Sequence, residues 1–168
     1  MKKFLFFAAC TLAFATSGLA QKGNNQVGIA VDLGLPIGSF GDAYKLGIGG
    51  QLRGLYGVGK AGQATLTTGY TSFKGKGSLY GNQKFSILPI LLGYRQHFTA
   101  LYVEPQLGVS TLTTKVPNFK YSETKFTYVV GVGYTMNGVD IGVRYQSAAE
   151  LGQFAFHLGY NIPLGGKK

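Results

Sequence analysis

Apolar and polar residues alternate with a period of two along most of the sequence after residue 25. Because successive side chains of a β-strand point to opposite faces, this pattern predicts strands with one apolar and one polar face. Clusters of Gly, Asn, Ser and Lys divide the pattern into eight segments: 26–35, 45–58, 63–72, 84–98, 101–113, 125–136, 139–146 and 153–162. Most of them have the roughly 9 to 11 residues with which a tilted strand crosses a lipid bilayer.

The connections between these segments are expected to alternate in length. The long ones are 36–44, 73–83, 114–124 and 147–152, and the short ones are 59–62, 99–100 and 137–138. The last of these is Asn137-Gly138, a strong hairpin signal because both residues tolerate a positive φ angle. Long loops at one rim and short turns at the other are typical of outer-membrane barrels.

The N-terminus has the order of a secretory signal peptide. Two lysines precede a mainly apolar run at 4–15, and the small residues Gly18 and Ala20 stand just before Gln21. We expect cleavage after Ala20; a lipoprotein signal ending at Cys10 is the alternative, with an apolar core of only about half a dozen residues. The expected organisation is a signal peptide at 1–20, a short periplasmic lead-in at 21–25, a barrel at 26–162 and a C-terminal tail at 163–168.

The two faces of the predicted strands differ in a way that favours a membrane. One face is apolar, with tyrosines near the strand ends, while the other carries mostly Gly, Thr and Gln. Arginine occurs only within the segments, whereas lysine lies at their ends and in the connections. A soluble barrel of the lipocalin kind, the alternative, would expose a face rich in Lys and Glu. We therefore interpret the polar face as a lumen and the apolar face as the lipid-facing wall.

Two parts of the chain carry a resemblance to a known family. They are the hairpin SILPILLGYR at 86–95 with LYVEPQLG at 101–108, and the last segment FAFHLGYNI at 154–162. The sequence resembles the small outer-membrane barrels of the OmpX and OmpA-barrel type, and the porin-like "outer membrane protein beta-barrel domain" family. The resemblance implies an all-β, eight-stranded antiparallel up-and-down transmembrane β-barrel in the bacterial outer membrane. It also implies that the barrel-assembly machinery recognises the last strand during insertion.

The polar face predicts a network inside the barrel. An eight-stranded barrel has an interior just wide enough for its own side chains, so charges placed there must pair. The expected members are Asp32, Arg53, Arg95, Glu104, Gln106, Asp140, Arg144 and His157. A tight turn around 98–101 sets Arg95 opposite Glu104, which predicts an ion pair between them. A structural network is the first interpretation, and a conducting path is the second.

The long loops combine basic and aromatic residues. The candidates for surface contact are Lys74, Lys76, Tyr80, Lys120 and Tyr121. Such a mixture can bind anionic glycans or lipid phosphates. The alternative is a solvated rim near the anionic headgroups of lipopolysaccharide.

The net charge and the two histidines limit the classes of function that the chain can have. The formal charge of +10 would suggest nucleic acid, but export argues against that partner. His97 and His157, the only histidines, lie far apart without a carboxylate cluster, so we expect no catalysis, no cofactor and no metal. We expect a monomeric structural protein of the envelope, in contact with outer-membrane lipids and lipopolysaccharide, with loops that serve adhesion or ligand contact. The alternatives are a narrow channel for ions or small solutes, and a lipid-modifying enzyme.

Overall fold

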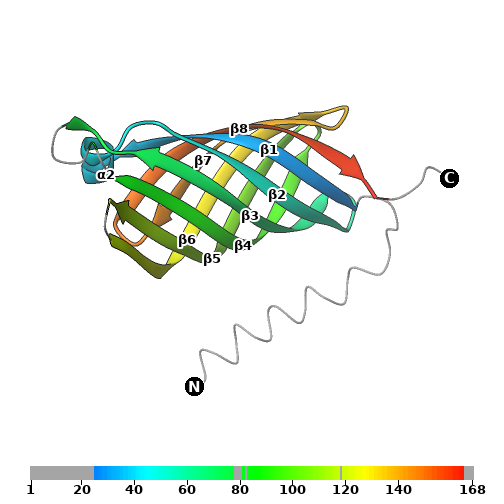
Figure 1. Cartoon of the computed structure of the whole chain (residues 1–168). Coiled ribbons are helices and arrows are strands. Elements are labelled where there is room, and N and C mark those ends of the chain that lie inside the picture. Colours follow the sequence, from blue (N-terminus) through cyan, green and yellow to red (C-terminus); the bar gives the residue numbers. More distant parts are fainter. Residues whose placement is uncertain (1–24, 78–80, 82, 118, 165–168) are drawn as a thin grey trace, which may run out of the picture.

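The computed structural model describes residues 25–77, 81, 83–117 and 119–164. Eight strands close into one antiparallel barrel in which each strand pairs with the next and β8 pairs with β1 (Figure 1). The elements are β1 (Gln26–Ile37), α2 (Gly38–Ala43), β2 (Gly47–Val58), β3 (Gly62–Lys74), β4 (Lys84–Phe98), β5 (Leu101–Val116), β6 (Phe119–Met136), β7 (Val139–Ala148) and β8 (Leu151–Pro163). The expected signal peptide and Tyr80 lie outside the described residues. No helix in the described part of the chain is long and apolar enough to cross a membrane.

Two of the expected long connections are wrong. Residues 114–124 belong mostly to β5 and β6, which run on to Val116 and from Phe119. The extension is rich in Ser and Thr, and the Thr113 and Ser122 hydroxyls lie 2.9 Å apart across it, a cross-strand contact that stabilises a sheet. At the next connection of this rim, 147–152, a tight turn at Ala149 and Glu150 joins β7 to β8. The barrel also ends at Pro163, one residue later than expected.

Both prolines of the central hairpin interrupt the ladder, as their missing N–H groups predict. The β3–β4 register passes from Thr68↔Ile90 to Thr71↔Ile87, which skips Pro89. The β4–β5 register passes from Gly93↔Gln106 to Gln96↔Val103, which skips Pro105. The pairing of His97 with Tyr102 beyond the gap continues the same register, as predicted.

The outer wall is apolar and the lumen is polar. Leu92 and Val130 on the outer wall are 67% and 50% exposed, whereas Arg95 and Thr67 inside are fully buried. Exposed tyrosines stand near the short-turn end of alternate strands, at Tyr56, Tyr94, Tyr134 and Tyr160. An outward apolar band with aromatic residues at its edges is the surface of a membrane-spanning barrel. The predicted assignment of the two faces is therefore confirmed.

An aromatic cluster that sequence reasoning missed fills the loop end of the lumen. Phe40 of α2 packs against Phe73 and Phe85, with ring centroids 5.2 Å and 5.1 Å away. Tyr44, Ile87, Leu112 and Ala148 complete the buried cluster. Helix α2 lies across this end of the barrel (Figure 1), so its one buried side chain, Phe40, reaches into the mouth.

Candidate functional site

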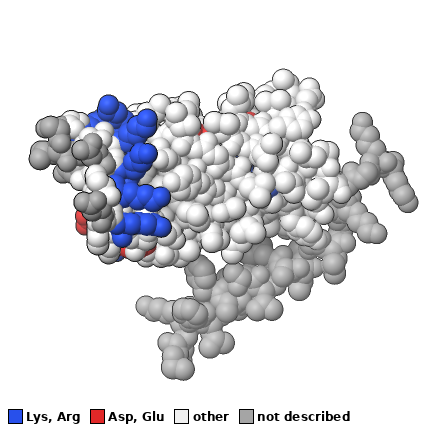
Figure 2. All heavy atoms as spheres, in the orientation of Figure 1, with Lys and Arg blue, Asp and Glu red and all other residues white. Residues whose placement is uncertain are grey.

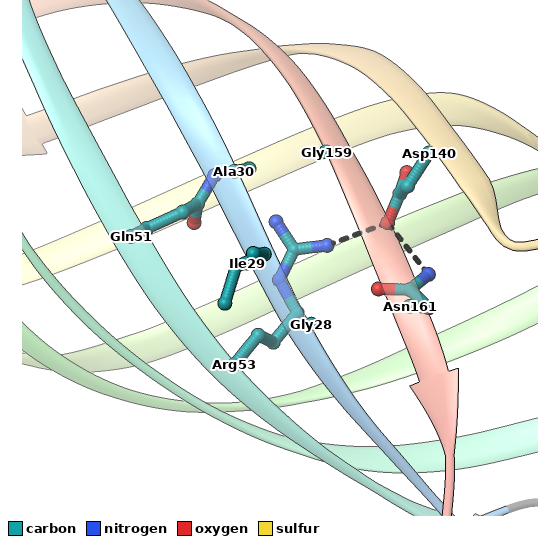
Figure 3. Close-up of a pocket in the computed structure, with 8 residues that line it drawn as sticks. All are labelled: Gly28, Ile29, Ala30, Gln51, Arg53, Asp140, Gly159 and Asn161. Carbon is teal, nitrogen blue, oxygen red and sulfur yellow. Dashed lines mark hydrogen bonds and ion pairs between the residues drawn. The ribbon is translucent and has the colours of Figure 1, made fainter.

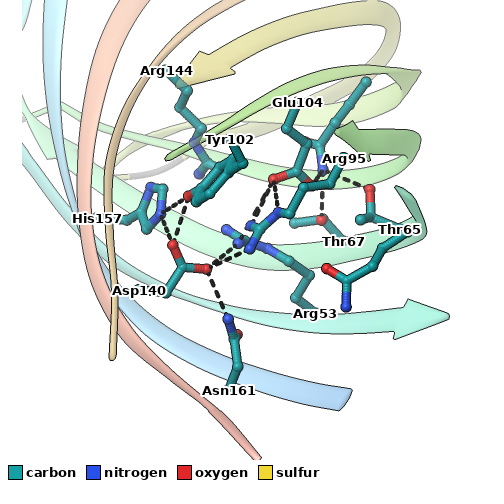
Figure 4. A network of polar contacts seen from close by, with 12 residues as sticks. Arg53, Thr65, Thr67, Arg95, Tyr102, Glu104, Asp140, Arg144, His157 and Asn161 are labelled. Carbon is teal, nitrogen blue, oxygen red and sulfur yellow. Dashed lines mark hydrogen bonds and ion pairs between the residues drawn. The ribbon is translucent and has the colours of Figure 1, made fainter. Parts of the chain in front are cut away.

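Asp140 on β7 is the centre of the lumenal network. Its Oδ2 accepts hydrogen bonds from Arg53 Nη1 and Arg95 Nη1, each at 2.9 Å, and from Asn161 Nδ2 at 3.1 Å. Its Oδ1 accepts a hydrogen bond from the Tyr102 hydroxyl at 2.6 Å. These donors come from β2, β4, β5 and β8, and Figure 4 shows them converging on the carboxylate. One buried carboxylate thus ties strands from all around the barrel together.

Arg95 and Glu104 form the predicted cross-strand ion pair. Arg95 donates to Glu104 Oε2 from Nε at 3.0 Å and from Nη2 at 2.7 Å. The other oxygen, Oε1, accepts a hydrogen bond from Gln106 Nε2 at 2.8 Å. The same Gln106 nitrogen lies 2.8 Å from the Thr67 hydroxyl on β3, so the pair is also linked to the next strand.

A second cluster lies towards the loop end. Arg144 donates to Asp32 Oδ2 from Nη2 at 2.7 Å and to Gln51 Oε1 from Nη1 at 2.8 Å. Gln51 closes the triangle through Nε2, which donates to Asp32 Oδ1 at 2.9 Å. With this cluster, the lumen holds Arg53, Arg95 and Arg144 against Asp32, Glu104 and Asp140, so its formal charges cancel. Pairing is what makes charge tolerable in a confined interior.

The two histidines occupy separate places. His157 Nε2 lies 3.0 Å from the Tyr102 hydroxyl and 3.3 Å from Asp140 Oδ1, inside the main network. His97 Nε2 lies 2.9 Å from Gln63 Oε1, near the short-turn end. Among the described residues, no group of three or more His, Cys, Asp or Glu side chains has a geometry that could hold a metal ion.

Tyr102, Asn161, Gln51 and Thr67 also belong to the network, although they are not among its predicted members, and Tyr102 is the largest of them. Its ring stacks on the Arg95 guanidinium, whose Cζ lies 3.7 Å from the ring centroid. The register runs from Tyr102 to Gly133, from Gly133 to Gly142, and from Gly142 to His157. A Cβ atom at Gly133 would lie 2.3 Å from the Tyr102 hydroxyl. Gly133 and Gly142 thus lie side by side next to the inward-facing Tyr102. Two such glycines are the sequence signal that a large side chain lies across them.

A hollow between β1, β2 and β8 is no ligand pocket. Figure 3 shows Arg53 reaching along it towards Asp140 and Asn161. Its lining also includes Gly28, Ile29, Ala30, Gln51 and Gly159, and it holds no volume large enough for a water molecule. The side chains of the network themselves fill this space.

The loop-end candidates do not form one site. Lys76 donates a hydrogen bond from Nζ to the Gly41 carbonyl oxygen of α2. The Tyr121 hydroxyl donates to Glu123 on the same strand, at 3.5 Å. Lys74 and Lys120 lie on the outer wall, where the structure places them in one row with two further lysines.

Together, the closed barrel, the apolar outer wall and the paired lumenal charges define a transmembrane β-barrel.

The sequence matches no protein-family model and no curated protein sequence. Solved structures do match. Ail, the attachment invasion locus protein of Yersinia pestis, is 15% identical with a TM-score of 0.61, over 86% of this chain and 100% of that one. Ail in complex with the heparin analogue sucrose octasulfate is 14% identical with a TM-score of 0.64, over the same shares.

Neisserial surface protein A is 15% identical to this chain, with a TM-score of 0.63, over 84% of this chain and 99% of that one. At such identities the likeness shows the fold. The expected resemblance to small outer-membrane barrels is confirmed at that level.

Proposed function

We propose that this chain is a bacterial outer-membrane protein with a structural role in the envelope, exported through a cleaved signal peptide and inserted by the barrel-assembly machinery as a monomer. The observation that carries the structural role is the filled lumen. Asp140 and its partners occupy the short-turn half of the barrel, the Arg144 cluster follows towards the loops, and the Phe40 cluster occupies the loop end. A lumen filled in this way leaves solutes no open path through the described part of the barrel, which argues against the channel.

A lipid-modifying enzyme is also less favoured. Such an enzyme needs a nucleophile and a base within hydrogen-bond reach of each other and open to the lipid. His157 is buried, and its Nε2 lies beside a tyrosine and an aspartate that already bind each other. We therefore propose that the chain has no catalytic activity.

The experiment that tests the proposal is membrane fractionation combined with heat-modifiable gel mobility. A folded outer-membrane barrel sediments with the outer membrane and migrates differently before and after boiling in detergent. Recovery in the periplasm would contradict the membrane role. Stepwise current through a planar bilayer containing the purified barrel would favour the channel instead.

Ligand contact at the loop end is the second candidate function. Ail was solved with a heparin analogue, a sulfated sugar, and this chain also carries exposed lysines at the loop end of its barrel. We propose binding of anionic partners there. Retention of the purified barrel on heparin-agarose, weakened by Lys76→Gln but not by Lys60→Gln in the short turn, would support loop binding.

A further inference from the structure

Four lysines occupy matched positions on four adjacent strands. Lys74 on β3 pairs with Lys84 on β4, Lys84 pairs with Lys115 on β5, and Lys115 pairs with Lys120 on β6. We call these four residues the lysine row. Cα atoms of directly paired residues lie about 4.5 to 5.5 Å apart, so the row extends roughly 15 Å around the barrel.

The lysine row belongs to the outer wall. All four side chains are exposed, while their neighbours Phe73 and Phe85 point into the lumen and are buried. Lys115 has the same parity as Leu107 and Val109, which face outward. Figure 2 shows the basic side chains as a band across the barrel near its loop end. The row therefore lies on the wall that also carries the lipid-facing belt.

The row has no acidic partner. Like charges directly opposite one another destabilise a sheet, so three successive Lys–Lys pairs carry a cost. Within residues 25–77, 81, 83–117 and 119–164, Lys125 is the one lysine with a carboxylate oxygen within 4.0 Å, from Glu123 at 3.0 Å. Anions from outside the chain would remove this repulsion.

A row of hydroxyl groups separates the lysines from the apolar belt. Ser72, Ser86, Thr113 and Ser122 pair in the same order across β3 to β6, two residues from the lysines. Ser86 is buried, and the other three are at least partly exposed. Further along the same strands, Leu66, Leu92, Leu107 and Tyr128 form an apolar row. Towards the loop end, the wall thus presents apolar side chains first, then hydroxyl groups and then ammonium groups. This order matches that of a membrane lipid from its acyl chains to its phosphate.

We propose that the lysine row binds the phosphate groups of phosphomonoester-bearing lipids in the membrane leaflet on the loop side. A phosphomonoester carries about −1.5 to −2 charges at neutral pH, so two such groups match four ammonium groups. Lysine binds phosphate as a point charge without the fixed geometry of arginine, which suits mobile headgroups. The proposal rests on the proposed membrane role, because only a membrane-embedded wall brings lipid phosphates to this row.

The test compares two double variants of the full mature barrel, folded in phosphatidylcholine nanodiscs that contain a low fraction of phosphatidic acid. Lys84→Gln/Lys115→Gln removes the centre of the row. Lys60→Gln/Lys125→Gln removes the same charge from the short turn and from the Glu123 pair. Native mass spectrometry of the released barrels measures the phosphatidic acid retained, relative to phosphatidylcholine.

The wild-type barrel should retain phosphatidic acid selectively. Each lysine near an anionic surface contributes a factor of about 5, so the row variant should lose tenfold or more of this preference. The control variant should stay within about twofold of wild type. Equal losses in both variants, or no loss in the row variant, would overturn the proposal.

Two further arms identify the source of the anion. Inorganic phosphate at the same concentration should not displace the lipid, and heparin binding should be the same in both double variants. Displacement by inorganic phosphate would overturn the lipid assignment in favour of a soluble anion. Loss of heparin binding in the row variant, with its lipid retention intact, would do the same.

Heat-modifiable mobility shows that each variant is folded. Periplasmic recovery of the wild type in cells would contradict the proposed membrane role, whatever the nanodisc result.

Discussion

The guanidinium of Arg95 holds one oxygen of Glu104 with two hydrogen bonds, from Nε at 3.0 Å and from Nη2 at 2.7 Å. Its third nitrogen, Nη1, donates to Asp140 at 2.9 Å. Glu104 and Asp140 are buried, so neither carboxylate can turn to water if the guanidinium is removed. We therefore expect the Arg95–Glu104 pair to contribute more to the free energy of unfolding than the other lumenal contacts.

Arg95→Met should destabilise the barrel by about 3 to 5 kcal/mol, because it leaves two buried carboxylates short of a partner. Glu104→Gln should cost less, since Arg95 keeps Asp140. The double variant should cost less than the sum of the two single variants. Urea unfolding in lipid vesicles measures the coupling as a double-mutant cycle.

The exposed pair of Lys125 and Glu123 is the matched control for this cycle. Its coupling should be much smaller than that of the buried pair, because water screens both groups. If the Arg95–Glu104 coupling were no larger than that of the control, the buried pair would not stabilise the lumen.

Tyr102→Phe separates the two contacts of the tyrosine. The variant loses the hydroxyl that donates to Asp140 at 2.6 Å, but keeps the ring stacked on Arg95. A hydrogen bond to a charged group contributes about 1.5 to 3 kcal/mol, and the unfolding free energy should fall by that amount. Tyr102→Leu, which also removes the cation–π contact, should cost more. Equal unfolding midpoints for wild type and Tyr102→Phe would show that the hydroxyl contributes nothing.

Gly133→Ala should disturb the network without changing a polar group. The new methyl group would lie 2.3 Å from the Tyr102 hydroxyl and 2.7 Å from the Ile141 carbonyl oxygen, so the tyrosine must move away from Asp140. Overpacking of this kind costs about 1 to 3 kcal/mol. Gly54→Ala is the control, because its nearest atom would be 4.0 Å away. Thermal unfolding should separate the two variants, and identical midpoints would mean that the space at Gly133 is not needed.

The sequence predicted the parts of the barrel that follow from period two. Parity alone placed Arg95 and Glu104 inside, and the short turn at Thr99 and Ala100 aligned them, because pairing is local in a hairpin. The limits of Lys84–Phe98 were also correct.

Parity could not show how the interior is filled. Phe40 lies outside the alternating segments, and its packing depends on the chain folding back over the mouth. The parity of Tyr102 matches that of Glu104 and points it inward, but its role depends on glycines on β6 and β7, which are distant in sequence. The Ser and Thr residues between 111 and 124 suit both a loop and a strand, and only the cross-strand contacts decide in favour of the strand.

Cysteine labelling tests which rim faces outward. Lys76→Cys lies at the loop end and Lys60→Cys in a short turn, and the only native cysteine, Cys10, falls in the expected signal peptide. An impermeant maleimide added to intact cells should label the first variant and not the second. Both should label after lysis, which controls for reactivity. Labelling of Lys60→Cys alone on intact cells would reverse the topology.

Arginine substitutions along one strand test whether the apolar wall faces lipid. Val130 and Thr124 both lie on the outer face of β6, but Val130 belongs to the apolar belt and Thr124 to the part near the loop end. Val130→Arg should cost about 2 to 4 kcal/mol in vesicles, because it places a charge near the bilayer midplane. Thr124→Arg should cost no more than about 1 kcal/mol, since the penalty falls towards the interface. The difference should appear in urea unfolding from vesicles. If both variants unfolded at the wild-type urea concentration, water rather than lipid would surround the wall at Val130.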